Sequence, residues 1–118
     1  MSEVVRIPKG TRVYLGAPAN PMPEEVVQTI IDSVSTDPNI VEAHLPQCFV
    51  ADLMKTPGQV LFLVLASKRL ESATISSITE RLNKAPLSHG SIDIFPLDVS
   101  HELYGSVRNS GCQIYKKS

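Results

Sequence analysis

The sequence predicts an α+β domain, and three observations carry this prediction. In some segments apolar residues occur at every second position, which is the period of a strand. In other segments they recur every three or four positions, which is the period of a helix, and the two kinds of segment are interspersed along the chain. Residues 59–66 (QVLFLVLA) are apolar on both faces, as in a central strand covered on two sides. Pro46 interrupts another alternating segment and, because it cannot donate to a β-ladder, predicts an edge strand or a bulge there.

The first strand and the first helix are expected at residues 11–16 and 24–35. Residues 11–16 (TRVYLG) alternate, with Val13 and Leu15 on the face expected to be buried. Residues 17–23 hold three prolines and form a connection, and proline is well tolerated at the start of a helix. Two glutamates follow, where the positive end of the helix dipole favours them, and an apolar stripe runs along the rest of the helix.

The second strand is expected at residues 40–48. Its alternation places Val41, Ala43 and Leu45 on a face buried against a helix. His44 and Pro46 lie on the opposite face, and the proline predicts that both are at or near an exposed edge.

A helix, a strand and a last helix follow the central strand. Residues 71–82 predict a helix from an apolar stripe, although many of the other positions are serine or threonine, which have modest helix propensity. Residues 91–97 (SIDIFPL) predict the last strand. Ser100 is the candidate cap of a short third helix, and residues 113–117 are expected as a tail.

Strand, helix, strand, strand, helix and strand in this order are the split βαβ arrangement of a ferredoxin-like plait. We therefore expect one domain, residues 1–118, with a four-stranded antiparallel sheet, two helices on one face and an extra C-terminal helix. The first and third strands are expected at the centre of the sheet, and the second and fourth at its edges. Because the third strand is apolar on both faces, the face away from the two helices must be covered by the third helix or by a second subunit.

The composition argues against several classes of protein. The chain has 118 residues, 42% of them hydrophobic, enough for a packed core and too many for a disordered chain. A net charge of −1 gives no support to a nucleic-acid partner, and the central strand lacks the basic and aromatic residues of an RNA-binding sheet. The longest apolar run, residues 60–66, is too short to cross a membrane. With no export signal visible, we expect a cytoplasmic protein whose two cysteines are reduced thiols.

The chemistry-bearing residues form no pattern that predicts catalysis or metal binding. His44 and Cys48 would lie about 13 Å apart along one strand, at about 3.3 Å per residue, too far to share a zinc ion. His89 is expected in a turn and His101 at a helix start, and neither cysteine has a recognisable histidine partner. Asp93, between two isoleucines, is expected to be solvated or ion-paired. We therefore expect no catalytic residue, no metal and no cofactor.

Several segments resemble the C-terminal domain of the enhanced serine sensitivity protein SseB family. They are residues 9–18 (KGTRVYLGAP) with Pro23, residues 41–45 (VEAHL), residues 92–97 (IDIFPL) and Tyr115, which takes the place of the tyrosine in a closing Pro-Phe-Tyr. The chain departs from the family pattern at His44, where the family has an aromatic residue, and at the closing triplet Gln113, Ile114, Tyr115. The resemblance implies a stand-alone copy of this bacterial domain, with no established catalytic activity, cofactor or active site.

The sequence and the resemblance together favour a non-enzymatic protein-interaction or regulatory domain. Its partner would be another protein or a second copy of the chain, giving a homodimer. The candidate interaction face consists of Leu61, Leu63, Leu65, Leu103, Tyr104 and Val107.

The alternative function is the sensing of a small ligand, an amino acid or an anion. Such a ligand would bind at the loop of residues 16–23, because this loop leads into a helix N-terminus, where backbone N–H groups can receive an anion. The candidate residues are Gly16, Ala17, Pro18 and Asn20.

Overall fold

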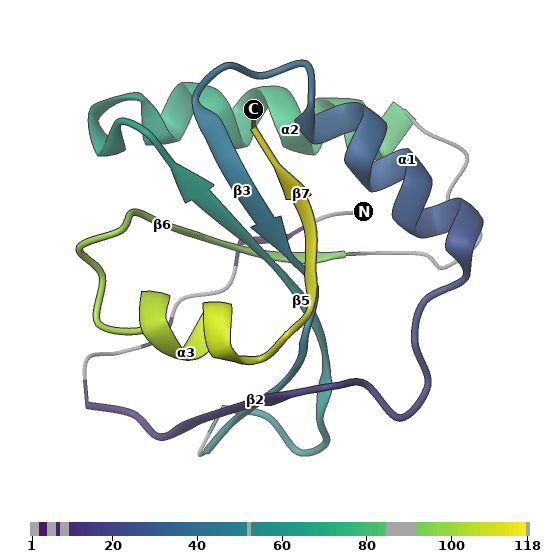
Figure 1. Ribbon diagram of the computed structural model, residues 1–118, viewed down its shortest axis with the longest axis vertical. Helices are drawn as coiled ribbons and strands as arrows, with labels where there is room; N and C mark the ends of the chain where they lie inside the picture. Colours follow the sequence, from purple (N-terminus) through teal and green to yellow (C-terminus); the bar gives the residue numbers. More distant parts are fainter. Residues whose placement is uncertain (1–2, 5–6, 8–9, 52, 85–91, 118) are drawn as a thin grey trace.

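Two helices lie over one face of a mixed sheet, and a third, shorter helix lies on the other face (Figure 1). This computed structural model describes residues 3–4, 7, 10–51, 53–84 and 92–117. Strands and helices are interspersed along the chain, so the mixed α and β class predicted from the sequence is confirmed.

The strands and helices are named in chain order. The strands are β1 (Glu3–Val4), β2 (Val13–Gly16), β3 (Ile40–His44), β4 (Gln47–Val50), β5 (Gly58–Leu65), β6 (Asp93–Leu97) and β7 (Gln113–Lys116). The helices are α1 (Glu24–Val34), α2 (Glu71–Lys84) after a single 3-10 turn at Lys68–Leu70, and α3 (Tyr104–Asn109). The strand order is β1-β6-β5-β3-β7, and β4 pairs with both β5 and β2.

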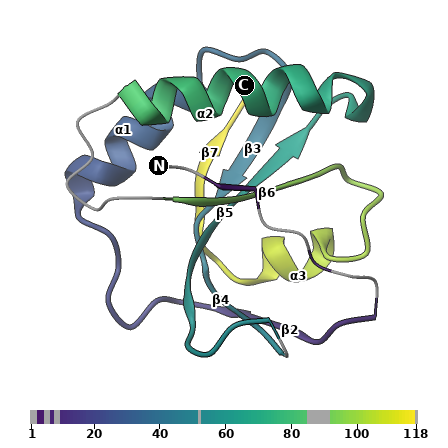
Figure 2. The ribbon, with the colours of Figure 1, turned by 180° about the vertical axis from the view of Figure 1, so that it is seen from behind.

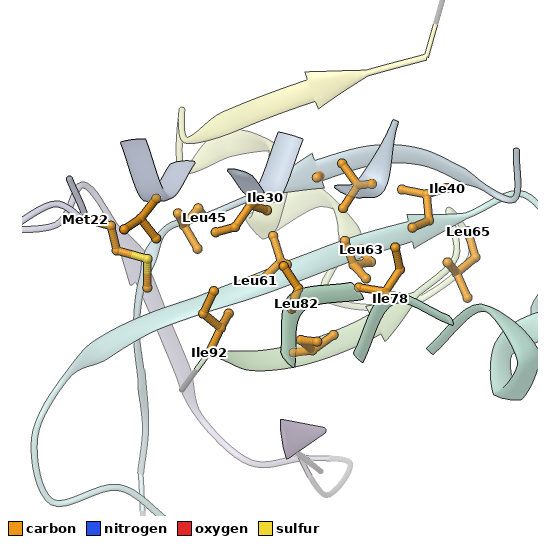
Figure 3. Packing of buried hydrophobic residues seen from close by; sticks show 14 residues of the cluster. Met22, Ile30, Ile40, Leu45, Leu61, Leu63, Leu65, Ile78, Leu82 and Ile92 are labelled. Carbon is orange, nitrogen blue, oxygen red and sulfur yellow. The ribbon is translucent and has the colours of Figure 1, made fainter. Parts of the chain in front are cut away.

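One face of the sheet is buried under α1 and α2, which lie side by side (Figures 1 and 2). β5 contributes Leu61, Leu63 and Leu65 to this face, where they meet Ile30 of α1 and Leu82 of α2 (Figure 3). Each such side chain stabilises the fold by roughly 1.5–3 kcal/mol when it is fully buried. The weak helix propensity of α2 is therefore offset by packing against β5.

The other face of β5 is covered by α3 and by the β2–β4 end of the sheet. Val60, Phe62 and Val64 point to this face, and Phe62 packs against Phe95 of β6 with ring centroids 5.5 Å apart. Val107 of α3 is fully buried in the same cluster. Of the two covers expected for this face, the third helix or a second subunit, the third helix is present, together with β2 and β4.

The strand order differs from that of a ferredoxin-like plait. In the plait, the first strand separates the third from the fourth, whereas here β6 lies directly beside β5, in parallel. β2, the expected first strand, pairs with β4 alone among the described strands. The physical reason is that β2 is short and one-sided: Val13 and Leu15 complete the cluster under α3, and its other face stays in solvent.

The expected second strand is divided at Pro46 and does not lie at an edge. β3 and β4 are its two halves. β7, which was expected to be a tail, is a strand that pairs with the outer side of β3. His44 and Pro46 are consequently buried rather than exposed. Ala43 and Leu45 are buried under the helices as predicted, but Val41 packs on the α3 side, because the pairing with β5 shifts between Ile40 and Glu42.

The helix boundaries agree with the sequence for α1 and α2 and differ for α3. Ser100 does not cap a helix: its backbone N–H and its hydroxyl both donate to Asp98 Oδ1, at 3.0 and 2.6 Å. This turn delays the start of α3 to Tyr104. Among the described residues, no helix is long and apolar enough to span a membrane. The start of the expected strand at 91–97, and His89, lie outside the described residues.

Candidate functional site

β2 and β4 form an antiparallel ribbon whose two faces differ in exposure. Val13 lies opposite Val50 and Leu15 opposite Cys48, and these four side chains face the cluster under α3. Tyr14 lies opposite Phe49, and both rings point to the other side of the ribbon. The strand alternation therefore produces an apolar inner face and an aromatic outer face.

The outer face of this ribbon exposes apolar side chains to solvent. Tyr14 is 54% exposed, and its ring centroid lies 6.3 Å from that of half-buried Phe49, with the planes tilted by 36°. Leu53, three residues after the end of β4, is also 54% exposed. Exposed Arg12, just before β2, carries the neighbouring charge. We call Tyr14 and Phe49 the ribbon patch.

Among the described residues, the outer edge of β2 has backbone groups without a strand partner, and this free edge lies beside the ribbon patch. The Ala51 N–H donates to the Arg12 carbonyl oxygen at 3.1 Å, which fixes the alternation of the ladder. Tyr14, two residues further, also directs its N–H and C=O toward β4, whereas those of Val13 and Leu15 point outward. In the part of the chain that the structure describes, no second strand pairs with β2.

The candidate ligand loop is held by two glutamine side chains. The Ala19 N–H donates to Gln47 Oε1 at 3.2 Å, and the Met22 N–H donates to Gln59 Oε1 at 2.8 Å. Gln59 Nε2 in turn donates to the Leu45 carbonyl oxygen at 3.1 Å, and Met22 is buried in the cluster under α1. These two backbone N–H groups are thus used within the protein, rather than being open to a ligand.

The candidate loop residues themselves lie along the surface of this connection. Gly16 ends β2, and its carbonyl oxygen accepts a weak hydrogen bond from Cys112 Sγ at 3.7 Å. Ala17 and Asn20 are exposed and Pro18 is half-buried. The loop leads into α1, whose first turn carries Glu24 and Glu25, and two carboxylates beside a helix N-terminus disfavour a bound anion.

The six residues of the predicted interaction face do not form one surface. Leu61, Leu63 and Leu65 are buried beneath α1 and α2, whereas Leu103, Tyr104 and Val107 lie on the opposite side of the sheet. The residues of β5 that α3 does cover are Val60, Phe62 and Val64. The alternation of β5 was read correctly, but the sequence does not show which of its two faces receives which helix.

A buried polar cluster joins β3 to α3. His44 Nε2 and Glu42 Oε1 are 2.8 Å apart, and the Tyr104 hydroxyl donates to Glu42 Oε2 at 2.7 Å. His44 is 1% exposed and Glu42 is 9% exposed. The guanidinium carbon of Arg108 lies 5.8 Å from the centroid of the Tyr104 ring. This cluster ties the short helix α3 to the sheet.

The cluster stabilises Glu42 in its ionised form. Burial alone would raise the pKa of Glu42, but hydrogen bonds from Tyr104 and His44, with the nearby positive charge of Arg108, outweigh burial and lower the pKa. The same hydrogen bond to Glu42 raises the pKa of Tyr104. Because an ionised carboxylate only accepts hydrogen bonds, His44 Nε2 carries the proton. His44 Nδ1 is buried without a partner among the described groups.

The other residues considered for chemistry lie apart from this cluster. Cys48 and Cys112 are free thiols, and burial raises the pKa of Cys48 to about 11. His101 Nδ1 accepts the Leu103 N–H at 3.0 Å, and its ring packs edge-on against Phe95. Across the described residues, no three or more His, Cys, Asp or Glu side chains are grouped so that they could hold a metal ion.

Two features of the structure, the Tyr14–Phe49 pair and the Glu42–Tyr104 contact, are not predicted by any pattern in the sequence. Alternation places Tyr14 on the solvent face of its strand, but Phe49 lies just beyond the second strand expected at residues 40–48, so the sequence does not predict the pair. Glu42 and Tyr104 are separated by 62 positions, and no local pattern links them.

Comparisons of the chain with protein-family models, with curated proteins and with solved structures found no match. The resemblance to the SseB C-terminal domain therefore stays a prediction.

Proposed function

We propose that this chain is a non-enzymatic protein-interaction domain of the SseB C-terminal type, with a regulatory role in the cytoplasm, and that it binds its partner at the free edge of β2. The observation that carries the proposal is the exposed ribbon patch beside outward-pointing backbone groups of Val13 and Leu15. The edge of β2 thus presents backbone hydrogen-bonding groups and aromatic side chains on the same surface.

Soluble proteins normally protect the edges of their sheets, for example with lysine side chains. β7, the outer neighbour of β3, follows this rule, since Lys116 is exposed on the strand and exposed Lys117 comes directly after it. β2 carries instead the exposed ring of Tyr14, and Arg12 lies just before its first residue. The contrast between the two strands favours β2 as the surface that receives a partner.

The mode of binding follows from the geometry of the edge. An extended segment can add a strand to an exposed sheet edge, where backbone hydrogen bonds give affinity and alternate side chains give specificity. The backbone groups of Val13 and Leu15 would pair with such a segment, and Tyr14 would contact an apolar side chain of the partner. A partner segment with apolar residues at every second position fits this surface.

The loop of residues 16–23 gives less support to the alternative function of ligand sensing. Two of its N–H groups already donate to Gln47 and Gln59, and the helix that follows begins with two glutamates. The interaction surface on β2 has no comparable internal partner among the described residues.

A peptide-display selection on the immobilised full chain tests the proposed function. We expect peptides with alternating apolar residues to be enriched, and their affinity to fall about tenfold or more in Val13→Pro, which removes one outward N–H but leaves the pairing with β4. Tyr14→Ser is a second variant that does not alter the backbone. Val99→Ser, at a residue 63% exposed elsewhere, is the matched control and should bind normally.

Two results would contradict the proposal. One is a selection that enriches no peptide family. The other is a selected family that binds Val13→Pro and Tyr14→Ser as tightly as the unmodified chain, which would place its site away from β2.

A further inference from the structure

We propose that the partner at this edge is a second copy of the chain, and that β2 pairs antiparallel with β2 of the other copy about a twofold axis at Tyr14. This inference rests on the proposed function and names its partner. It commits to one register, with Tyr14 opposite Tyr14 of the second copy and Val13 opposite Leu15 of the second copy.

The backbone of β2 is self-complementary in this register. Val13 and Leu15 are the residues whose N–H and C=O point away from β4, and the twofold axis brings Val13 of one copy opposite Leu15 of the other. In an antiparallel ladder, two residues that oppose one another with outward groups exchange both backbone hydrogen bonds. In this register the outward backbone groups of both residues of each copy can therefore be hydrogen-bonded at once.

The side chains of the two ribbons also match across the twofold axis. On the outer face, the row Phe49–Tyr14 of one copy meets the row Tyr14–Phe49 of the other, giving four aromatic rings in line across four strands. On the inner face, Val50 and Val13 of one copy meet Leu15 and Cys48 of the other. Directly opposed aromatic and branched residues are the pairs that stabilise sheets.

The charges near the edge do not oppose this pairing. Arg12 of one copy lies opposite Gly16 of the other, so the two arginines sit at opposite ends of the joint. The net charge of −1 gives little repulsion between two whole molecules. β7, by contrast, carries exposed Lys116 within the strand itself.

The contact between the two β2 strands is short, and this limits the affinity of the dimer. β2 has four residues, so the contact is smaller than the roughly 1,200–2,000 Å² of total surface typical of stable complexes. We therefore expect a weak dimer, with a dissociation constant in the micromolar range or above, that forms as the concentration rises. In a weak dimer of this kind, a competing strand can displace β2 of the second copy, which agrees with a regulatory role.

Sedimentation velocity of the full chain, from about 5 to about 500 µM, tests the inference. The unmodified chain should dimerise within this range. Tyr14→Glu and Tyr14→Lys should each weaken the dimer by about fivefold to tenfold or more, because the axis places like charges opposite one another. An equimolar mixture of these two variants should recover the dimer, since glutamate then opposes lysine. Val99→Lys is the control and should dimerise normally.

The contrary outcomes separate the twofold register from the proposed function. A chain that stays monomeric at every concentration, a dimer that the two Tyr14 variants do not weaken, or variants that do not recover on mixing would each overturn the twofold register. If the chain is monomeric while peptides selected by display still bind the β2 edge, self-pairing is overturned and the proposed function stands. If neither a dimer nor an edge-bound peptide is found, both are overturned.

Discussion

Replacing Tyr104 by phenylalanine isolates the contribution of the buried polar cluster. The ring packs against the cluster under α3, so Tyr104→Phe preserves the apolar contact and removes only the hydroxyl. That hydroxyl donates to Glu42 Oε2 at 2.7 Å. The change therefore leaves a nearly buried carboxylate with one hydrogen bond fewer.

The expected loss of stability can be worked from this contact. A hydrogen bond to a charged group contributes about 1.5–3 kcal/mol, and the partial exposure of Tyr104 reduces this to about 1–2 kcal/mol. Because the pKa of Glu42 is lowered in the folded state, its contribution is fully present above the unfolded-state pKa and is lost as the pH falls through the folded-state pKa. The difference between the two proteins should therefore be constant near neutral pH and shrink as the pH falls below about 4.3, the ordinary pKa of glutamate.

Urea unfolding at several pH values measures this difference. At neutral pH the midpoint of Tyr104→Phe should be lower by about 0.5–1.5 M. Tyr14→Phe is the matched control, since it removes the same atom from an exposed ring, and its midpoint should be unchanged. A midpoint of Tyr104→Phe equal to that of the unmodified chain at neutral pH, or an effect of the same size at every pH, would refute the reasoning.

Three further predictions concern the core, the thiols and the C-terminal segment. Asn39→Ala should cost about 2–3 kcal/mol in urea unfolding, because the side chain is 7% exposed and bonds Ser67 twice and Thr74 once; a loss below about 0.5 kcal/mol would contradict this. Iodoacetamide at about pH 8 should alkylate Cys112 well before Cys48, whose thiol is buried with a pKa of about 11, and equal rates by mass spectrometry would contradict the burial of Cys48. Truncation after Val99 should cause aggregation in light scattering, because it removes α3 and β7 and exposes one face of β5; a soluble, folded fragment would show that this cover is dispensable.

The sequence predicts the types of the elements well because those depend on local periodicity. The apolar stripe of α1 and the two-sided burial of β5 are each encoded within a few neighbouring residues. Strand pairing depends on contacts between distant segments, and the periodicity of β2 is the same whether it lies beside β5 or beside β4. The plait order was therefore wrong although the order of elements along the chain was right.

The candidate site was predictable only in part, for the same reason. Alternation in residues 11–16 was sufficient to place Tyr14 on the outer face of a strand. The free edge depends on β7 taking the outer side of β3, while β2 pairs with β4 at the other end of the sheet. The hydrogen bond between Tyr104 and Glu42 depends on where α3 packs against the sheet. No short segment encodes either arrangement.

Amide hydrogen exchange at residues 13–15 tests most directly the claim that β2 offers a free edge to a partner. In a dilute solution of the monomer, the amides of Val13 and Leu15 should exchange rapidly, while the Tyr14 amide, directed at β4, should be protected. At high protein concentration, or with a selected peptide bound, Val13 and Leu15 should become protected and Tyr14 should stay so. Protection of Val13 and Leu15 already in the dilute monomer, or rapid exchange of both in the complex, would contradict the account.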